Sequence, residues 1–169
     1  MPEPPALPER PELPGSDDTH PPQDLVDRLA TLPLFAGLRG PDLESIAARC
    51  DLAVAHPGQV VQAQDVPVRR WHLITAGHVI VQRDAVPIGL LSCGDSWGEH
   101  ALLNQQRSPM TVVALSPTTL LSLRDREFFA IPEEHPVLAG RLVARAAVSP
   151  DRLALPVFNA LTNFADRSA

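Results

Sequence analysis

Between residues 52 and 124 the chain is built from short apolar segments, and this pattern limits the choice of folds. Each segment is rich in Val, Leu and Ile, and Gly, Pro or Asp separates it from the next. Short apolar runs bounded by turn residues are typical of β-strands. We therefore expect strands near residues 52–55, 59–63, 71–75, 78–82, 87–91, 110–115 and 119–124. Many short strands at close, regular spacing indicate an antiparallel sandwich, roll or barrel.

Two helical patterns precede this region. Apolar residues recur at helical spacing from Leu25 onward, and Pro33 stops the run. A second helix follows Gly40, which is an acceptable N-cap, with Pro41 at the first helical position. Asp42 suits the positive end of that helix.

The chain returns to helical patterns after the β region. Asp125 is expected to cap a short turn that runs through Phe128 and Phe129. Pro136 is expected to open a helix with one apolar face, formed by Leu138, Leu142 and Ala146. The whole pattern predicts a mainly β domain with flanking helices, of the α+β class.

Composition divides the chain into three parts. Eight of the 19 prolines fall within the first 22 residues, so we expect residues 1–23 to be a disordered Pro-rich tail. Residues 24–148 are expected to hold the folded domain. Residues 149–169 are expected to form a short amphipathic C-terminal segment, whose apolar face consists of Val157, Phe158, Leu161 and Phe164.

The composition also argues against several classes of function. The net charge of −6 argues against the basic footprint of a nucleic-acid-binding protein. No membrane-spanning run and no secretory signal are visible, so we expect a cytoplasmic protein. Cys50 and Cys93 are too few for a four-thiolate metal site, and no two histidines stand two residues apart. A Gly-x-Ser-x-Gly signature is also missing, so we expect no metal, no catalytic residue and no enzyme activity.

Four stretches of sequence resemble a known family when they are taken together. They are residues 29–43 (LATLPLFAGLRGPDL), 58–61, 72–79 (HLITAGHV) and 90–103 (LLSCGDSWGEHALL). Their order and spacing are similar to those of the cyclic nucleotide-binding domain. That family includes bacterial regulators of the catabolite-activator and fumarate–nitrate type, kinase regulatory subunits and the tails of some ion channels. The resemblance covers roughly residues 25–148 and implies an eight-stranded jelly-roll β-barrel flanked by helices.

The resemblance also implies a ligand site, the phosphate-binding cassette of the family. Its residues here would be Gly98, Glu99, His100, Ala101, Leu102, Arg107 and Ser108. By resemblance, Glu99 would accept a hydrogen bond from the ribose 2′-hydroxyl, and Arg107 would pair with the cyclic phosphate through its fork of donors. The Ser108 hydroxyl would reach the same phosphate. The implied ligand is cAMP or another cyclic nucleotide, with no prosthetic group.

The sequence departs from the family pattern after Arg107. The stretch from Arg107 to Thr111 is one residue longer than usual and contains Pro109. If the following strand keeps its usual register, Ser108 takes the place of the arginine, because a slip of one residue turns a side chain to the opposite face. A bulge at Pro109 would instead restore Arg107. Both arrangements remain open at this point, as does base selectivity, since the helix at 136–148 offers only arginines and no Ser or Thr.

Two functions follow from these patterns. The first is a stand-alone regulatory sensor that binds a cyclic nucleotide and signals by movement of its C-terminal helices. The alternative is a degenerate member of the fold that acts as a protein-interaction or dimerisation module without nucleotide. In both, the C-terminal helices are expected to contact a second copy or a partner protein. The 20 residues after Ser149 are too few for a helix-turn-helix, so no direct DNA binding is expected.

Overall fold

The computed structural model describes residues 23–147. The predicted Pro-rich tail at 1–23 therefore lies outside the described residues except for its last position, Gln23, which begins a helix. The amphipathic segment at 149–169 also lies outside them.

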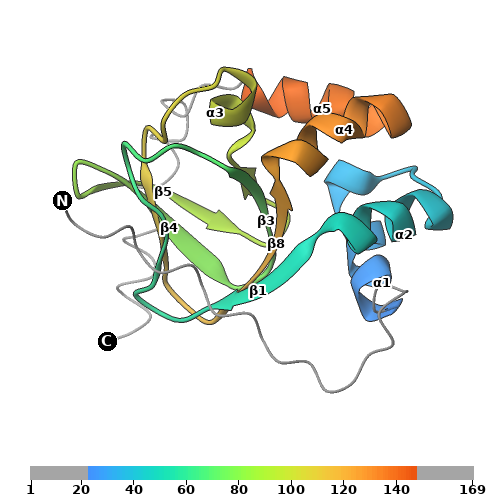
Figure 1. Ribbon diagram of the computed structural model, residues 1–169. Coiled ribbons are helices and arrows are strands. Elements are labelled where there is room, and N and C mark those ends of the chain that lie inside the picture. Colours follow the sequence, from blue (N-terminus) through green and yellow to red (C-terminus); the bar gives the residue numbers. More distant parts are fainter. Residues whose placement is uncertain (1–22, 148–169) are drawn as a thin grey trace.

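Within this range, eight antiparallel strands form two sheets of four (Figure 1). The first sheet has the order β1-β8-β3-β6 and the second has the order β2-β7-β4-β5. The strands are β1 (Asp51–Ala55), β2 (Val60–Gln62), β3 (Arg70–Ala76), β4 (His78–Arg83), β5 (Val86–Ser92), β6 (Ser96–Trp97), β7 (Thr111–Ala114) and β8 (Thr118–Arg124). Two four-stranded sheets in this order make a jelly roll, so the predicted fold class is confirmed.

All seven predicted strands are present, and an eighth was missed. Strand β6 has only two residues and lies between Gly94 and Gly98, where the sequence reads as a turn. It exists because it pairs with β3, with Trp97 opposite His72 and Ser96 opposite Leu73. This pairing brings the chain to the first residue of the predicted cassette.

In the described part of the chain, five α-helices and one 3-10 turn flank the barrel. They are α1 (Gln23–Thr31), η1 (Pro33–Phe35), α2 (Gly40–Arg49), α3 (Glu99–Leu103), α4 (Asp125–Glu134) and α5 (Pro136–Ala146). Figure 1 shows α1, α2, α4 and α5 gathered at one side of the barrel, with α3 beside α5.

Two details of these helices correct the sequence predictions. Arg39, not Gly40, is the N-cap of α2, and the backbone N–H of Arg39 donates a hydrogen bond to the Asp42 carboxylate at 3.3 Å. The expected short turn after Asp125 is a ten-residue helix that continues through Pro132. Its length follows from Phe128 and Ile131, which are buried against the other helices and the sheet.

The first sheet is buried on both faces because side chains alternate along its central strands. On β3, Trp71 and Leu73 face the helices, whereas Ile74 faces the second sheet. His72 also lies in the barrel interior, where its Nδ1 is 2.8 Å from the Ser122 hydroxyl and its ring stacks on Trp97. Burial lowers the pKa of His72 to about 3, with a further contribution from Arg70, so this histidine is a neutral part of the core.

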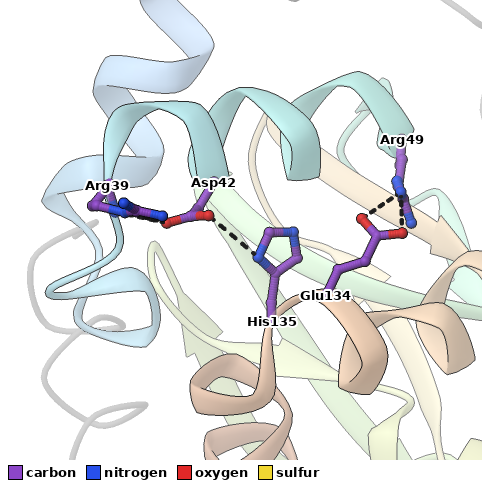
Figure 2. A network of polar contacts seen from close by, with 5 residues as sticks. All are labelled: Arg39, Asp42, Arg49, Glu134 and His135. Carbon is purple, nitrogen blue, oxygen red and sulfur yellow. Dashed lines mark hydrogen bonds and ion pairs between the residues drawn. The ribbon is translucent and has the colours of Figure 1, made fainter.

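Polar contacts join α2 to the junction of α4 and α5 (Figure 2). The Arg49 guanidinium donates to both carboxylate oxygens of Glu134 at 2.6 Å. At the junction itself, His135 Nδ1 lies 3.9 Å from the Asp42 carboxylate. These contacts connect α2 to the start of α5, and the other part of α5 packs against α3.

Candidate ligand-binding site

A cavity of about 290 Å³ opens beside the turn from β6 to α3. Five of the seven residues predicted for the cassette line it: Gly98, Glu99, His100, Ala101 and Ser108. Further lining residues, which the sequence did not single out, include Asp95, Ser96 and Met110. The cavity thus lies between the cassette on one side and the start of the β7 segment on the other.

Gly98 allows α3 to start directly against β3. Its φ of +102° lies in the left-handed region that side-chain-bearing residues avoid. A Cβ at this position would stand 2.7 Å from the Arg70 carbonyl oxygen and 3.3 Å from the Trp71 Cα. The glycine is therefore required both by its backbone angle and by the close approach of the neighbouring strand.

Glu99 is the most unusual polar residue of the site. Its side chain is nearly buried, with 7% of the residue exposed. One carboxylate oxygen, Oε1, accepts a hydrogen bond from the Ser96 hydroxyl at 3.3 Å, while Oε2 is buried without a hydrogen bond of full geometry. The buried indole N–H of Trp71 likewise lacks a partner of full geometry and acts on this carboxylate as a donor. Burial raises the pKa of Glu99, although its hydrogen bonds and the nearby Arg145 partly oppose this shift. A buried acceptor without a partner is rare in folded proteins and is suited to receive a donor from a ligand.

Ser108 lines the cavity, whereas Arg107 does not. The backbone here pairs with the segment before β3: Ser108 donates its N–H to the Val66 carbonyl at 2.9 Å, and its carbonyl accepts from Asp65 at 2.8 Å. Ser108 is 4% exposed, and its hydroxyl donates to the Met110 carbonyl at 2.6 Å.

Arg107 faces the opposite way. Its Nη1 donates to the Asp65 carbonyl at 2.5 Å, and the side chain lines a neighbouring cavity of about 430 Å³ together with Leu102. The structure therefore does not bring Arg107 and Leu102 to the same cavity as the other predicted residues. Ser108, and not Arg107, is therefore the residue of this pair that lies at the cavity with the other predicted residues.

A different arginine reaches the cavity from α5. Arg145 Nη1 lies 3.0 Å from the Ser96 hydroxyl oxygen and 3.3 Å from the Gly94 carbonyl. The other arginine of this helix, Arg141, instead donates to the Leu34 carbonyl at 2.7 Å. The sequence showed two arginines on the last helix without assigning either to the site, and the fold distinguishes them.

Helix α5 is tied to the cassette by a second contact. His100 Nδ1 lies 3.0 Å from the carbonyl of Ala146, in the last turn of α5. Helix α5 is therefore joined to α3 through His100 and to the β6 segment through Arg145, and both of these residues line the cavity.

Residues 23–147 contain neither a candidate metal site nor a candidate membrane-spanning helix. No three His, Cys, Asp or Glu side chains come together there as a metal site would require. None of the helices in this range combines the length and apolar character needed to cross a membrane.

Comparison with known proteins gives the same family as the sequence motifs. The family model for the cyclic nucleotide-binding domain matches residues 53–135. Glutaminase 1 of Bradyrhizobium diazoefficiens is 29% identical over 142 residues, which are 82% of this chain and 22% of that protein. Acetyltransferase Pat of Mycolicibacterium smegmatis is 36% identical over 119 residues, 68% of this chain and 35% of Pat. The chain thus spans only a minor part of the length of these relatives.

A solved structure agrees with these matches. A cAMP-binding acyltransferase from Mycobacterium smegmatis superposes with a TM-score of 0.58 at 33% identity, covering 72% of this chain and 39% of that one. The structure of this chain agrees with these matches, since its strands have a jelly-roll order. It also has a glycine before α3 and a buried carboxylate directly after that glycine. Residues 53–135 of this chain therefore belong to the cyclic nucleotide-binding domain family.

Proposed function

We propose that this chain is a regulatory module that binds a cyclic nucleotide, with cAMP as the first candidate, in the cavity beside α3. The 33% identical structure whose name states cAMP binding supports this choice of ligand. Gly98, Glu99, His100, Ala101 and Ser108 form the binding residues in this proposal. We keep residues 24–148 as the ligand-binding unit, as predicted from the sequence.

The observation that carries the proposal is the unpartnered oxygen of Glu99. An acceptor buried without a hydrogen bond raises the free energy of the ligand-free protein, and a donor from a ligand would relieve it. A ribose 2′-hydroxyl supplies such a donor next to the phosphate that defines a cyclic nucleotide.

Titration calorimetry with cAMP and 2′-deoxy-cAMP tests this role of Glu99. A hydrogen bond to a charged group contributes about 1.5–3 kcal/mol, so the deoxy ligand should bind roughly 10–100-fold more weakly to the wild-type chain. In Glu99→Gln the neutral amide oxygen is a poorer acceptor, and the ratio should fall to roughly 3–10-fold. Glu133→Gln, on the exposed surface of α4, is the matched control and should keep the wild-type ratio.

Two results would count against the proposal. Equal affinity of the wild-type chain for the two ligands would remove Glu99 from the site. The lack of binding to any cyclic nucleotide would reject the function as a whole.

We further propose that ligand binding is signalled through α5. The contacts of His100 and Arg145 join this helix to residues that line the cavity. A ligand that alters these contacts therefore alters the free energy with which α5 docks. Hydrogen exchange of the α5 amides with and without cAMP measures this coupling. Unchanged exchange under saturating ligand would contradict it.

A second function, as an interaction module, is favoured by the outer face of α5. Val137 and Val143 are 57% and 55% exposed there, and Arg107 lies outside the cavity in which it was expected. In this alternative the valines pack against a second copy of the chain. Light scattering would then give the mass of a dimer for the wild-type chain and of a monomer for a Val137→Ser, Val143→Ser double variant. A monomeric wild-type chain would contradict dimerisation through this face.

A further inference from the structure

We infer that Arg145 on α5, and not Arg107 beside the cassette, supplies the guanidinium that binds the phosphate of the ligand. This inference rests on the proposed function and names the residue that gives the site its preference for an anion. It would make the last described helix a direct part of the binding site.

The first step is that Arg107 is held away from the cavity. Its neighbour Ser108 is fixed by two backbone hydrogen bonds to Asp65 and Val66, and Arg107 itself pairs with Pro67 in an isolated bridge. Bringing the guanidinium into the cavity requires a slip of one residue, because neighbouring side chains point to opposite faces. Such a slip would break both hydrogen bonds and withdraw the buried Ser108.

The second step is that Arg145 already stands at the cavity. Among the described lining residues it is the one arginine, and the sequence contains no lysine. The cavity wall also carries two acidic residues, Asp95 and Glu99. Without a cation in this wall, the two carboxyl groups would disfavour a phosphate.

The third step is that Arg145 has donors to spare. A guanidinium has five N–H donors, and the acceptors of Arg145 are two neutral oxygens, the Gly94 carbonyl and the Ser96 hydroxyl. Neither neutral acceptor cancels its charge, and the nearby Glu99 carboxylate attracts it without a direct hydrogen bond, so a phosphate would share the guanidinium with Glu99. The side chain is half-buried, so its attraction for an anion is less screened than that of a fully exposed arginine.

Arg145 lies in the last turn of α5, so an anion bound by its guanidinium would stabilise the docked position of this helix. Because coupling between two equilibria is reciprocal, docking of α5 and binding of the anion strengthen each other by the same factor.

The test compares the affinity for cAMP of four chains: wild type, Arg145→Gln, Arg107→Gln and Arg126→Gln. Arg126 is an exposed residue of α4 and serves as the control for losing one surface charge. We expect Arg145→Gln to weaken binding roughly 10–100-fold, and the other two variants to stay within about twofold of wild type. Adenosine, which carries no phosphate, should lose little affinity in Arg145→Gln.

An additional variant guards against a folding defect in Arg145→Gln. Arg145→Lys keeps the charge but loses the fork, and its affinity should lie between those of wild type and Arg145→Gln. The inference is overturned if Arg145→Gln binds cAMP like wild type, or if Arg107→Gln causes the larger loss. A wild-type chain that binds no cyclic nucleotide would instead reject the proposed function, and this inference with it.

Discussion

Replacing Gly98 with alanine should disturb both the stability of the domain and its cavity. The new methyl group would stand 2.7 Å from the Arg70 carbonyl oxygen and 3.3 Å from the Trp71 Cα. Both are backbone atoms of β3, a central strand whose pairing with β8 prevents it from moving away. Relief must therefore come from the β6–α3 turn, which would carry Glu99 away from its present position.

The size of the effect follows from two contributions. A left-handed backbone costs a residue other than glycine about 1–2 kcal/mol. Overpacking a tight site costs about 1–3 kcal/mol more, so the free energy of unfolding should fall by roughly 2–5 kcal/mol. For a domain of this size that loss lowers the melting temperature by roughly 10 °C or more.

Thermal melts of Gly98→Ala and Gly140→Ala measure this effect with an internal control. Gly140 lies within α5, and a Cβ there would meet no atom within 4 Å. Alanine is favoured over glycine inside a helix, so Gly140→Ala should raise the free energy of unfolding by about 0.5–1 kcal/mol and melt at a slightly higher temperature than wild type. The reasoning is refuted if Gly98→Ala melts within about 2 °C of wild type, since that result requires β3 and the turn to separate freely.

Three further expectations concern titration and an ion pair. The folded protein binds a proton at Glu99 more tightly than the unfolded chain does, because burial raises the pKa of this carboxyl. The resulting contribution to the free energy of unfolding is present at low pH and is lost as the pH rises through that pKa. Glu99→Gln should therefore raise the urea midpoint of the ligand-free protein more at about pH 8 than at about pH 5. An equal effect at both pH values would contradict a buried, strained carboxylate. For His72 the folded pKa of about 3 lies below the ordinary 6.5, so its contribution is complete above pH 6.5 and is lost as the pH falls from there toward 3. The free energy of unfolding from urea titrations should therefore decline below about pH 6, by up to about 1.4 kcal/mol per pH unit. A flat profile would show that His72 is accessible to protons without unfolding. Arg49 and Glu134 are 31% and 44% exposed, so Arg49→Ala should lower the free energy of unfolding by less than about 1 kcal/mol, and less still in about 1 M salt. A large loss that ignores salt would mean that Arg49 acts through packing.

The strands and most helices were predictable because their signals are local. Apolar periodicity at a spacing of four residues puts Leu138 and Leu142 on one helix face, and both are buried in the core. The two-residue β6 was missed because a strand of that length has no period, and only its pairing with β3 defines it. The length of α4 was underestimated because the prediction ended at Phe129, whereas the helix continues through Pro132 and buries Ile131.

The candidate residues of the site differ in the same respect: some could be predicted from a local motif, and others could not. Gly98 and Glu99 belong to one short motif, and their positions beside the cavity follow from it. The choice between Arg107 and Ser108 could not be read from the sequence, because it is set by hydrogen bonds to Asp65 and Val66, more than 40 positions earlier. Arg145 was visible only as one of two arginines on a helix, and its approach to the cavity depends on how α5 packs against α3.

Titration calorimetry of the wild-type chain with cAMP, with 5′-AMP as the control, tests the proposed function most directly. We expect saturable binding of cAMP at one site per chain and much weaker binding of 5′-AMP, whose additional phosphate charge is disfavoured beside Asp95 and Glu99. If neither cAMP nor any other cyclic nucleotide binds, the unpartnered oxygen of Glu99 serves no such ligand, and the interaction-module alternative replaces the sensor.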